Sequence, residues 1–245
     1  MAGDSISAKQ VPMSRIPLVF LPGLICDAAL WQQQADALSD IADATIADLT
    51  HAISIAEMAD QVLASAPPQF ALAGLSMGGY VALEMMRRAP QRVLKLALFD
   101  TSAAPDPAER AAQRRAGLES LKLGKFVGVT TKMLPQLVHA QHLESEVGEA
   151  VMAMAARVGS QVFIRQQEAI LERDNYLPTL TDIKVPTLVA IGDSDILTPM
   201  QHSLDIHWGI KGSRFHVFKN CGHLPALEVP QETTMLLRRW LAPNF

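Results

Sequence analysis

At 245 residues, with 49% hydrophobic and 19% charged residues, the chain can form one α/β domain with an insertion and is too apolar to be disordered. A formal net charge of −4 with scattered basic residues gives no reason to expect a nucleic-acid partner. No apolar run approaches the length of about twenty residues that spans a bilayer, and the polar stretch 1–14 lacks the apolar centre of a secretory signal. We therefore expect a cytoplasmic protein with no membrane partner.

The sequence lacks paired cysteines and the common cofactor and metal motifs. Cys26 and Cys221 stand far apart and form no C-x-x-C pair, which favours a reducing compartment, or chance, over a disulfide framework. The sequence also lacks the lysine-containing phosphate loop, the H-E-x-x-H zinc motif and the glycine spacing of dinucleotide-binding folds. We therefore expect neither a cofactor nor a metal.

Apolar runs and helical segments alternate up to residue 99. The helix that follows Ser54-Ile-Ala-Glu57 opens with a capping box, in which serine and glutamate satisfy free N–H groups of the first turn. Strands that alternate with helices through short connections predict a parallel sheet covered by helices on both faces. The predicted strands are 16–21, 44–49, 70–75 and 93–99, and the predicted helices are 28–38, 54–66 and 80–89.

The alternation stops at residue 104 and resumes near residue 182. Between these points the composition is helical, and no segment is a convincing strand. Because strands return afterwards, the helical segment is predicted to be a cap inserted into an α/β core. The predicted domains are the core at 15–103 and 182–245, the cap at 104–181, and a flexible tail at 1–14. The helices expected in the cap are 107–121, 125–134, 144–158 and 161–173, followed by strands at 185–191 and 215–218 and a closing helix at 227–241.

The predicted strand at 70–75 runs directly into Gly74-Leu75-Ser76-Met77-Gly78, and a helix follows. A turn this tight leaves no room for side chains two residues on either side of the serine, which explains Gly74 and Gly78. Ser76 is then expected in a strained conformation that displays its hydroxyl, while the N–H of Met77 faces any oxygen that becomes negative beside it. The pattern predicts a nucleophilic serine; the alternative is a glycine-rich turn without chemistry.

A serine nucleophile needs a base, and a group that orients the base. Of the seven histidines, His223 lies in the loop between the last strand and the last helix, at the sheet edge that also displays Ser76. The acid is expected on another loop of this edge, where Asp193 and Asp195 follow the strand at 185–191. The remaining histidines are expected to be surface or structural residues: His51, His139, His142, His202, His207 and His216.

With these pieces the chain resembles an α/β-hydrolase-fold enzyme with a helical cap. The resemblance rests on the Gly-x-Ser-x-Gly elbow at 74–78, the Gly-x-x-Asp loop at 192–195 and the Gly-His pair at 222–223, in the family's order of serine, acid and histidine. It covers the chain from Ile16 to the C-terminus and is weakest in the cap.

The resemblance also implies roles for the acidic residues. Asp195 occupies the position of the family's catalytic acid, and Asp193 becomes a turn residue. Asp100, at the end of the strand after the elbow, stands where some relatives carry their acid instead.

The first-strand loop departs from the family pattern. Relatives usually begin this loop with His-Gly, whereas this chain has Pro22-Gly23. The residue after the glycine supplies the second oxyanion N–H in the family, which implies Leu24 beside Met77. Because backbone N–H groups do that work, loss of the histidine alters the bracing of the loop and removes no donor. Little room remains before Ile16 for the family's two leading antiparallel strands.

These observations predict a serine hydrolase that cleaves a small carboxylic ester or lactone through an acyl-enzyme intermediate. Ser76 attacks, His223 moves the proton, Asp195 orients the imidazole, and the N–H groups of Met77 and Leu24 stabilise the oxyanion. A carbon–carbon bond hydrolase or a cofactor-free lyase on the same triad is the first alternative, and a non-catalytic hydrolase-like binding protein is the second. The oligomeric state stays open. The pocket is expected between elbow and cap, with walls that include Leu24, Ile25, Met133, Met152 and Met154.

Overall fold

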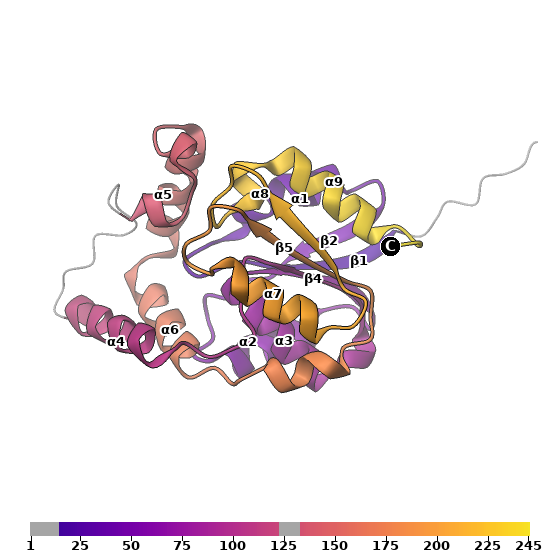
Figure 1. Cartoon of the computed structure of the whole chain (residues 1–245), viewed down its shortest axis with the longest axis horizontal. Helices are drawn as coiled ribbons and strands as arrows, with labels where there is room; N and C mark the ends of the chain where they lie inside the picture. The colour runs from indigo at the N-terminus through magenta and orange to yellow at the C-terminus, as the bar shows by residue number, and fades with distance from the viewer. Residues whose placement is uncertain (1–14, 123–132) are drawn as a thin grey trace, which may run out of the picture.

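The structure is a computed structural model that describes residues 15–122 and 133–245. The tail predicted at 1–14 and nearly all of the helix predicted at 125–134 lie outside the described residues. Within the described residues, six strands form one parallel sheet in the order β2-β1-β3-β4-β5-β6, which confirms the predicted parallel sheet (Figure 1). The strands are β1 (Ile16–Leu21), β2 (Ala42–Ile46), β3 (Phe70–Leu75), β4 (Val93–Phe99), β5 (Thr187–Gly192) and β6 (Arg214–Phe218).

The described helices lie near the predicted positions, with three main differences. The helix predicted at 80–89 begins at Met77 and ends at Arg88. The helix predicted at 28–38 is a 3₁₀ turn, Ala28–Leu30, followed by a short α-helix, and the closing helix is broken at Val229, immediately before Pro230. Proline has no N–H to donate inside a helix, so a new helix starts there instead. The α-helices are α1 (Gln32–Ala37), α2 (Ile55–Ser65), α3 (Met77–Arg88), α4 (Ala108–Lys122), α5 (Glu146–Val158), α6 (Ser160–Leu171), α7 (Met200–Gly209), α8 (Pro225–Glu228) and α9 (Pro230–Leu241).

Both faces of the sheet are buried under helices. Along β1, Leu18 and Phe20 belong to one apolar cluster, whereas Val19 and Leu21 belong to another, because successive side chains of a strand point to opposite faces. The first cluster includes Trp240 of α9, and the second includes residues of α2, α3 and α7. Figure 1 shows the same two layers, with α1 and α9 on one face and α2, α3 and α7 on the other.

The strand β2 begins and ends earlier than predicted. Its pairing with β1 starts at Ala42 and extends to Ile46, and the apolar signal that suggested a strand up to residue 49 has another cause. Leu49 lies outside the strand but is almost fully buried in the cluster beneath α2 and α3. The strand predicted up to residue 49 therefore included Leu49, a buried loop residue.

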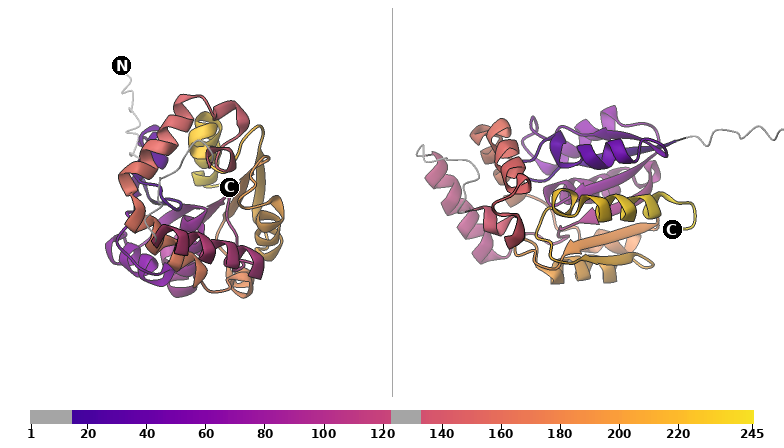
Figure 2. Two further views of the ribbon diagram at one scale, coloured as in Figure 1. Left: turned by 90° about the vertical axis from the view of Figure 1, so that its left-hand side faces the viewer. Right: turned by 90° about the horizontal axis from the view of Figure 1, so that it is seen from above.

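In the described residues, the segment between β4 and β5 consists of helices joined by loops and contains no strand. It contains α4, α5 and α6 and the 3₁₀ turns Leu134–Gln136, Ala140–His142 and Leu177–Asp182. The helices α4, α5 and α6 lie together beyond one end of the sheet, as Figure 1 and the right view of Figure 2 show. We call residues 104–181 the helical segment.

Within the described ranges, no single helix is long and apolar enough to cross a membrane. The pair α5 and α6 meets the length and composition criteria only when taken together, and it is bent by 92°.

Candidate active site

Ser76 lies at the tip of the turn between β3 and α3 in a conformation that non-glycine residues rarely adopt. Its φ is 55° and its ψ is −116°. A Cβ at Gly74 would overlap the carbonyl of Gly78, and a Cβ at Gly78 would overlap the carbonyl of Leu21. The two glycines are therefore required by close backbone approach, as the sequence predicted, and the strain at Ser76 is held by the surrounding structure.

The end of β4 holds this turn from the side. The N–H of Ser76 donates to the carbonyl of Phe99 at 3.0 Å, and the hydroxyl of Thr101 donates to the carbonyl of Ser76 at 2.7 Å. A Cβ at Gly79 would overlap the side chain of Thr101, so α3 and the segment after β4 are in close contact. These contacts fix both backbone polar groups of Ser76 and leave its hydroxyl for the cavity.

Asp195 follows β5 and is saturated with hydrogen bonds. One carboxylate oxygen accepts the N–H groups of Leu197 at 2.8 Å and Thr198 at 3.1 Å, and the other accepts the hydroxyl of Thr198 at 2.5 Å. That second oxygen lies 2.8 Å from Nδ1 of His223. Burial opposes ionisation, but the adjacent His223 and these hydrogen bonds outweigh it, so the pKa of Asp195 is lowered.

The ionised Asp195 determines which nitrogen of His223 carries the proton. A carboxylate without a proton can only accept, so Nδ1 of His223 is the donor in their 2.8 Å contact. In the neutral ring Nε2 is then the basic nitrogen. Both side chains are buried, with 5% of His223 and none of Asp195 exposed, which limits competition by water for this contact.

Glu228 anchors the loop that carries His223, a role that was not predicted from the sequence. Its carboxylate accepts the N–H groups of Gly222 at 2.9 Å, Leu224 at 2.9 Å and His139 at 2.7 Å. The N–H of His223 itself donates to the carbonyl of a residue in the helical segment, Leu137, at 3.1 Å. The only signal in the sequence is an acidic residue shortly after the Gly-His pair, which could not have been distinguished from a surface glutamate.

The two alternative acids lie in different surroundings. Asp193 is exposed and accepts the hydroxyl of Ser194 at 3.0 Å and the N–H of Cys221 at 3.3 Å, as expected for a turn residue. Asp100 is fully buried and accepts the N–H of Gly192 at 2.9 Å. Burial, and then the charge of Asp195, raise the pKa of Asp100 well above its usual value, which favours the protonated form of this carboxyl.

A cluster of possible metal ligands is formed by Asp100, Asp195 and His223. One oxygen from each carboxyl and a ring nitrogen all lie within 4.8 Å of one another. Metal ligands must be deprotonated, however, and the raised pKa of Asp100 works against that. Nδ1 of His223 is moreover engaged by Asp195. The donor set therefore fits a metal poorly.

The loop after β1 is braced without the histidine that the family usually has. The indole N–H of Trp31 donates to the carbonyl of Leu21 at 3.2 Å, and its ring stacks on Phe20 with ring centres 4.8 Å apart. The N–H of Ile25, a residue with a φ of 57°, donates to the side chain of Gln166 on α6 at 2.8 Å. A tryptophan from the core and a glutamine from the helical segment thus hold the loop.

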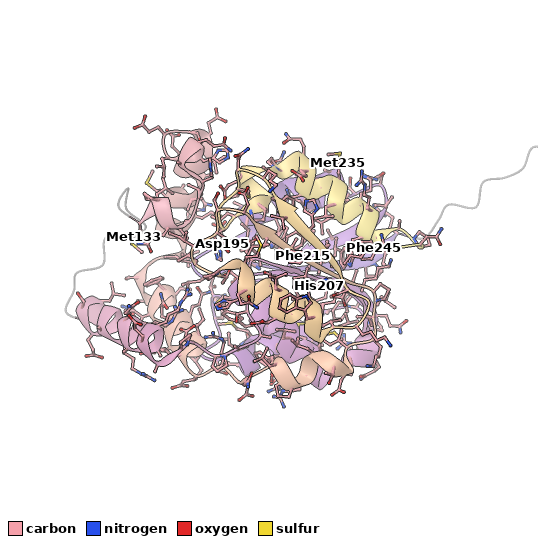
Figure 3. The ribbon with its side chains drawn as sticks, viewed as in Figure 1. Met133, Asp195, His207, Phe215, Met235 and Phe245 are labelled. Carbon is pink, nitrogen blue, oxygen red and sulfur yellow. The ribbon has the colours of Figure 1, made fainter. Side chains whose placement is uncertain are left out.

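A cavity of about 190 Å³ brings these elements together. Ser76 and His223 both line it, with Leu24 and Ile25 from the loop after β1, and among the described residues His223 is the only histidine in its walls. In Figure 3, Asp195 and Met133 lie toward the end of the sheet where α5 is found, whereas Met235 and Phe245 lie on the α9 side. The helical segment supplies much of the rest of the wall: Arg110, Arg114, Met133, Gln136, Leu137, Val151, Met154, Phe163, Gln167 and Ile170.

The expected pocket methionines divide between wall and core. Met133 and Met154 line the cavity, but Met152 packs against the hydrophobic core instead. Both cysteines are buried and free. Cys26 lines the cavity, yet burial raises its pKa to about 12, so its thiol stays protonated and does not compete as a nucleophile.

The sequence profile of the alpha/beta hydrolase fold family matches residues 16–230. The chain belongs to this family. The match confirms the predicted fold and family. In the described residues the sheet has six parallel strands and no leading antiparallel strand.

Several proteins of known function are similar to this one. It is 29% identical over 219 residues to a pimeloyl-[acyl-carrier protein] methyl ester esterase of Neisseria meningitidis, covering 86% of this chain and 83% of the relative. It is also 29% identical over 185 residues to a 2-hydroxy-6-oxononadienedioate/2-hydroxy-6-oxononatrienedioate hydrolase of Escherichia coli, covering 70% and 62%. A solved thermophilic esterase from Thermogutta terrifontis superposes with a TM-score of 0.81 at 26% identity, covering 92% and 89%. These relatives support the predicted ester-cleaving hydrolase.

Proposed function

We propose that this protein is a serine hydrolase that cleaves a small carboxylic ester or lactone through an acyl-enzyme intermediate, with Ser76, His223 and Asp195 as its catalytic triad. The observation that carries the proposal is the 2.8 Å contact between Nδ1 of His223 and the ionised carboxylate of Asp195, at the wall of a cavity that Ser76 also lines. The similarity to esterases supports the same reaction.

In the first half of the reaction, the hydroxyl oxygen of Ser76 attacks the carbonyl carbon while its proton moves to Nε2 of His223. Asp195 stabilises the imidazolium and keeps Nδ1 protonated. Collapse of the tetrahedral intermediate breaks the bond to the alcohol oxygen, which takes the proton from Nε2 and leaves. In the second half, water repeats the attack on the acyl-enzyme, with His223 again as base and then as acid, and the carboxylic acid is released.

The negative oxygen of both tetrahedral intermediates is proposed to rest against the backbone N–H groups of Met77 and Leu24. Met77 is the first residue of α3, where N–H groups have no partner within the helix and the helix dipole favours negative charge. Leu24 lines the cavity on a loop that lies against the elbow, since a Cβ at Gly23 would stand 3.5 Å from Cβ of Ser76. Each such donor contributes about 3 kcal/mol to transition-state stabilisation.

We also propose that residues 104–181 act as a cap on a core made of residues 15–103 and 182–245. Side chains from α4, α5 and α6 line the cavity that Ser76 and His223 share. A cover of this kind removes water from the site, which strengthens the electrostatic interactions that stabilise the oxyanion.

A second candidate is hydrolysis of a carbon–carbon bond on the same triad, because the chain is similar to a dienedioate hydrolase as well as to esterases. The two reactions differ in the leaving group, which is an alkoxide in one case and a carbanion in the other. They can therefore be separated by substrate.

The test is a panel of short p-nitrophenyl and alkyl esters, simple lactones and a 2-hydroxy-6-oxo acid, with product identification. Turnover of esters or lactones is expected, together with a loss of about 10⁶-fold in Ser76→Ala. The matched control is Ser194→Ala, which should retain activity. It removes an exposed serine from the loop that carries Asp195 (residues 193–199, called the acid loop below). Cleavage of the oxo acid alone would favour the second candidate, and equal ester turnover by Ser76→Ala would overturn the assignment of the nucleophile.

A further inference from the structure

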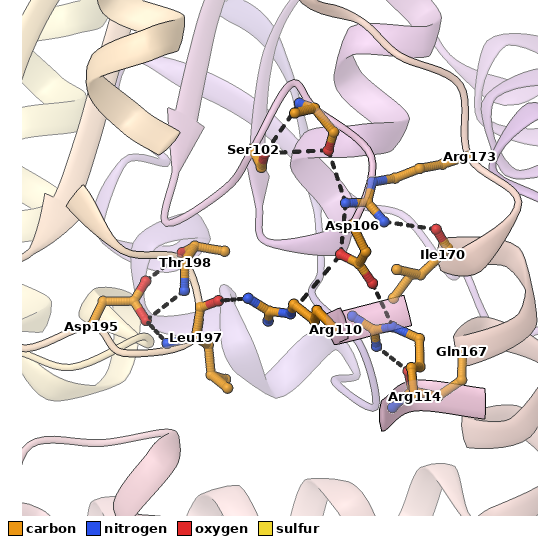
Figure 4. Close-up of polar contacts among 11 residues, drawn as sticks. Ser102, Asp106, Arg110, Arg114, Gln167, Ile170, Arg173, Asp195, Leu197 and Thr198 are labelled. Carbon is orange, nitrogen blue, oxygen red and sulfur yellow. Dashed lines mark hydrogen bonds and ion pairs between the residues drawn. The ribbon is translucent and has the colours of Figure 1, made fainter. Parts of the chain in front are cut away.

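Two arginine side chains line a cavity whose other walls are largely apolar. Arg110 and Arg114 are four residues apart on α4 and so share one face of that helix. Both line the cavity together with Ser76 and His223. Figure 4 shows them beside Leu197 of the acid loop and Gln167 of α6. The chemistry of ester cleavage has no use for a guanidinium at this place.

The arginines carry more positive charge than their protein partners neutralise. Asp106 is the carboxylate they share: it lies 2.9 Å from Arg114, 2.9 Å from Arg173 and 3.9 Å from Arg110. Three guanidinium groups on one carboxylate leave two positive charges in this cluster. Only 6% of the Asp106 side chain is exposed, so screening by water is limited.

The neighbouring His202 lies close enough to Arg110 for the charge of that arginine to affect its pKa. Its pKa is lowered, first by burial and then by the charge of Arg110, with a smaller contribution from Arg173. Asp205 and Asp195 act in the opposite direction and do not reverse the shift. Burial and the nearby arginines thus both favour the neutral form of His202.

The contacts of the two arginines also leave hydrogen-bond donors for a ligand. Arg110 donates through one terminal nitrogen to the carbonyl of Leu197. Arg114 donates to Asp106 and to the side-chain oxygen of Gln167. A guanidinium offers more N–H groups than these contacts use, and its planar fork matches the two oxygens of a carboxylate or phosphate.

Bracing of α4 explains only part of this arrangement. The contact from Arg110 to Leu197 ties the helix to the acid loop, but a neutral donor could do the same at lower desolvation cost. Bracing also does not account for two cations on the wall of a cavity lined by Met133, Met154 and Phe163. A cavity with an apolar wall and a cationic corner matches a substrate with an apolar chain and an anionic end.

We propose that Arg110 and Arg114 form an anion-binding subsite, and that the substrate is an ester whose apolar chain carries a second, anionic oxygen group, a carboxylate or a phosphate. This inference rests on the proposed esterase function. Ser76 attacks the ester carbonyl while the anionic end lies against the two guanidinium groups, and the apolar chain contacts the walls between them.

The test compares matched p-nitrophenyl esters of equal chain length that end in a methyl group, a carboxylate or a phosphate. For wild type we expect kcat/KM to favour one anionic ester over the neutral one by about tenfold or more at low salt, at the chain length that reaches the subsite. High salt should reduce the preference. The carboxylate and phosphate arms identify which anion is preferred.

Variants locate the preference on the arginines. Arg114→Gln and Arg110→Gln should lower the ratio of anionic to neutral kcat/KM, chiefly through KM, and Arg114→Lys should restore part of it. The matched control is Arg115→Gln, which removes the same charge from an exposed position on α4 and should leave the ratio unchanged. Equal kcat/KM for neutral and anionic esters in wild type, or an equal fall of the ratio in Arg115→Gln, would overturn the proposal.

A binding measurement keeps this test separate from the test of esterase activity. The dicarboxylate product should raise the melting temperature of wild type more than the monocarboxylate of equal length, and Arg114→Gln should remove the difference. If no ester is hydrolysed but this difference is found, the esterase proposal fails and the anion subsite stands. If esters are hydrolysed without any anion preference, the subsite fails and the esterase stands.

Discussion

The loops at the edge of the sheet and the helical segment that covers them are held in place in different ways. Ser76, Asp195 and His223 are each fixed through backbone groups, such as the carbonyl of Phe99 and the N–H of Leu197. The arginines on the cavity wall of the helical segment are instead held by contacts of their side chains, such as that of Arg114 with Asp106. In the proposed mechanism the reaction depends on backbone geometry, whereas the proposed substrate contacts depend on side chains that can change without altering the fold.

The largest effect that tests this contrast is expected on kcat, from substitution of the proposed acid, Asp195. Asp195→Asn keeps the size of the side chain but can donate to Nδ1 of His223, which stabilises the wrong tautomer. We expect kcat to fall by about 10⁴-fold. Asp193→Asn is the matched control and should have little effect, because its carboxylate holds a turn. A larger loss in Asp193→Asn, measured with the same ester, would contradict the account.

Two glycine substitutions test the contrast at the level of stability. Gly78→Ala places a Cβ against the carbonyl of Leu21 and should lower the free energy of unfolding by roughly 3 kcal/mol. Gly117→Ala lies within α4, where a Cβ would meet nothing within 4 Å, and should raise stability by about 0.5–1 kcal/mol. Urea denaturation measures both. Similar changes in the two variants would show that the elbow is less constrained than its geometry implies.

The smallest effect is expected at Asp100. Its pKa is raised by burial and by the charge of Asp195, so the folded state holds a proton that the unfolded state releases above the usual pKa of an aspartate. Asp100 therefore destabilises the folded state least at acidic pH. The loss in free energy of unfolding grows as pH rises toward the folded-state pKa. Asp100→Asn resembles the protonated carboxyl, should keep kcat within about tenfold of wild type, and should gain stability relative to wild type as pH rises.

This expectation can be checked by urea denaturation at several pH values together with ester turnover. A stability difference that is constant with pH would mean that Asp100 titrates alike in the folded and unfolded chains. A loss of activity greater than that of Asp195→Asn would make Asp100 the acid.

Much of the sheet could be predicted because backbone demands leave marks in the sequence. The strands β3 and β4 were predicted to the residue, since each is a short apolar run that ends at a turn or a polar residue. The elbow was equally visible, because only glycine tolerates the contact between Gly74 and Gly78. The break at Val229 was missed although Pro230 marks it, because the apolar periodicity continues across it.

The rest of the site could not be predicted because it depends on contacts between distant segments. Glu228 accepts hydrogen bonds from the loop that carries His223, and Gln166 accepts one from Ile25. Neither has a fixed spacing in the sequence from its partners. Arg110 and Arg114 read as ordinary charges of an exposed helix. Their position on the cavity wall follows from how α4 packs, which the sequence alone does not determine.

The most direct test of the central claim is covalent labelling with a fluorophosphonate probe, followed by intact-mass and peptide analysis. The account predicts one adduct per chain on the peptide that contains Ser76, no adduct in Ser76→Ala, and much slower labelling in Asp195→Asn than in Asp193→Asn. An adduct on any other residue, or undiminished labelling of Ser76→Ala, would contradict it.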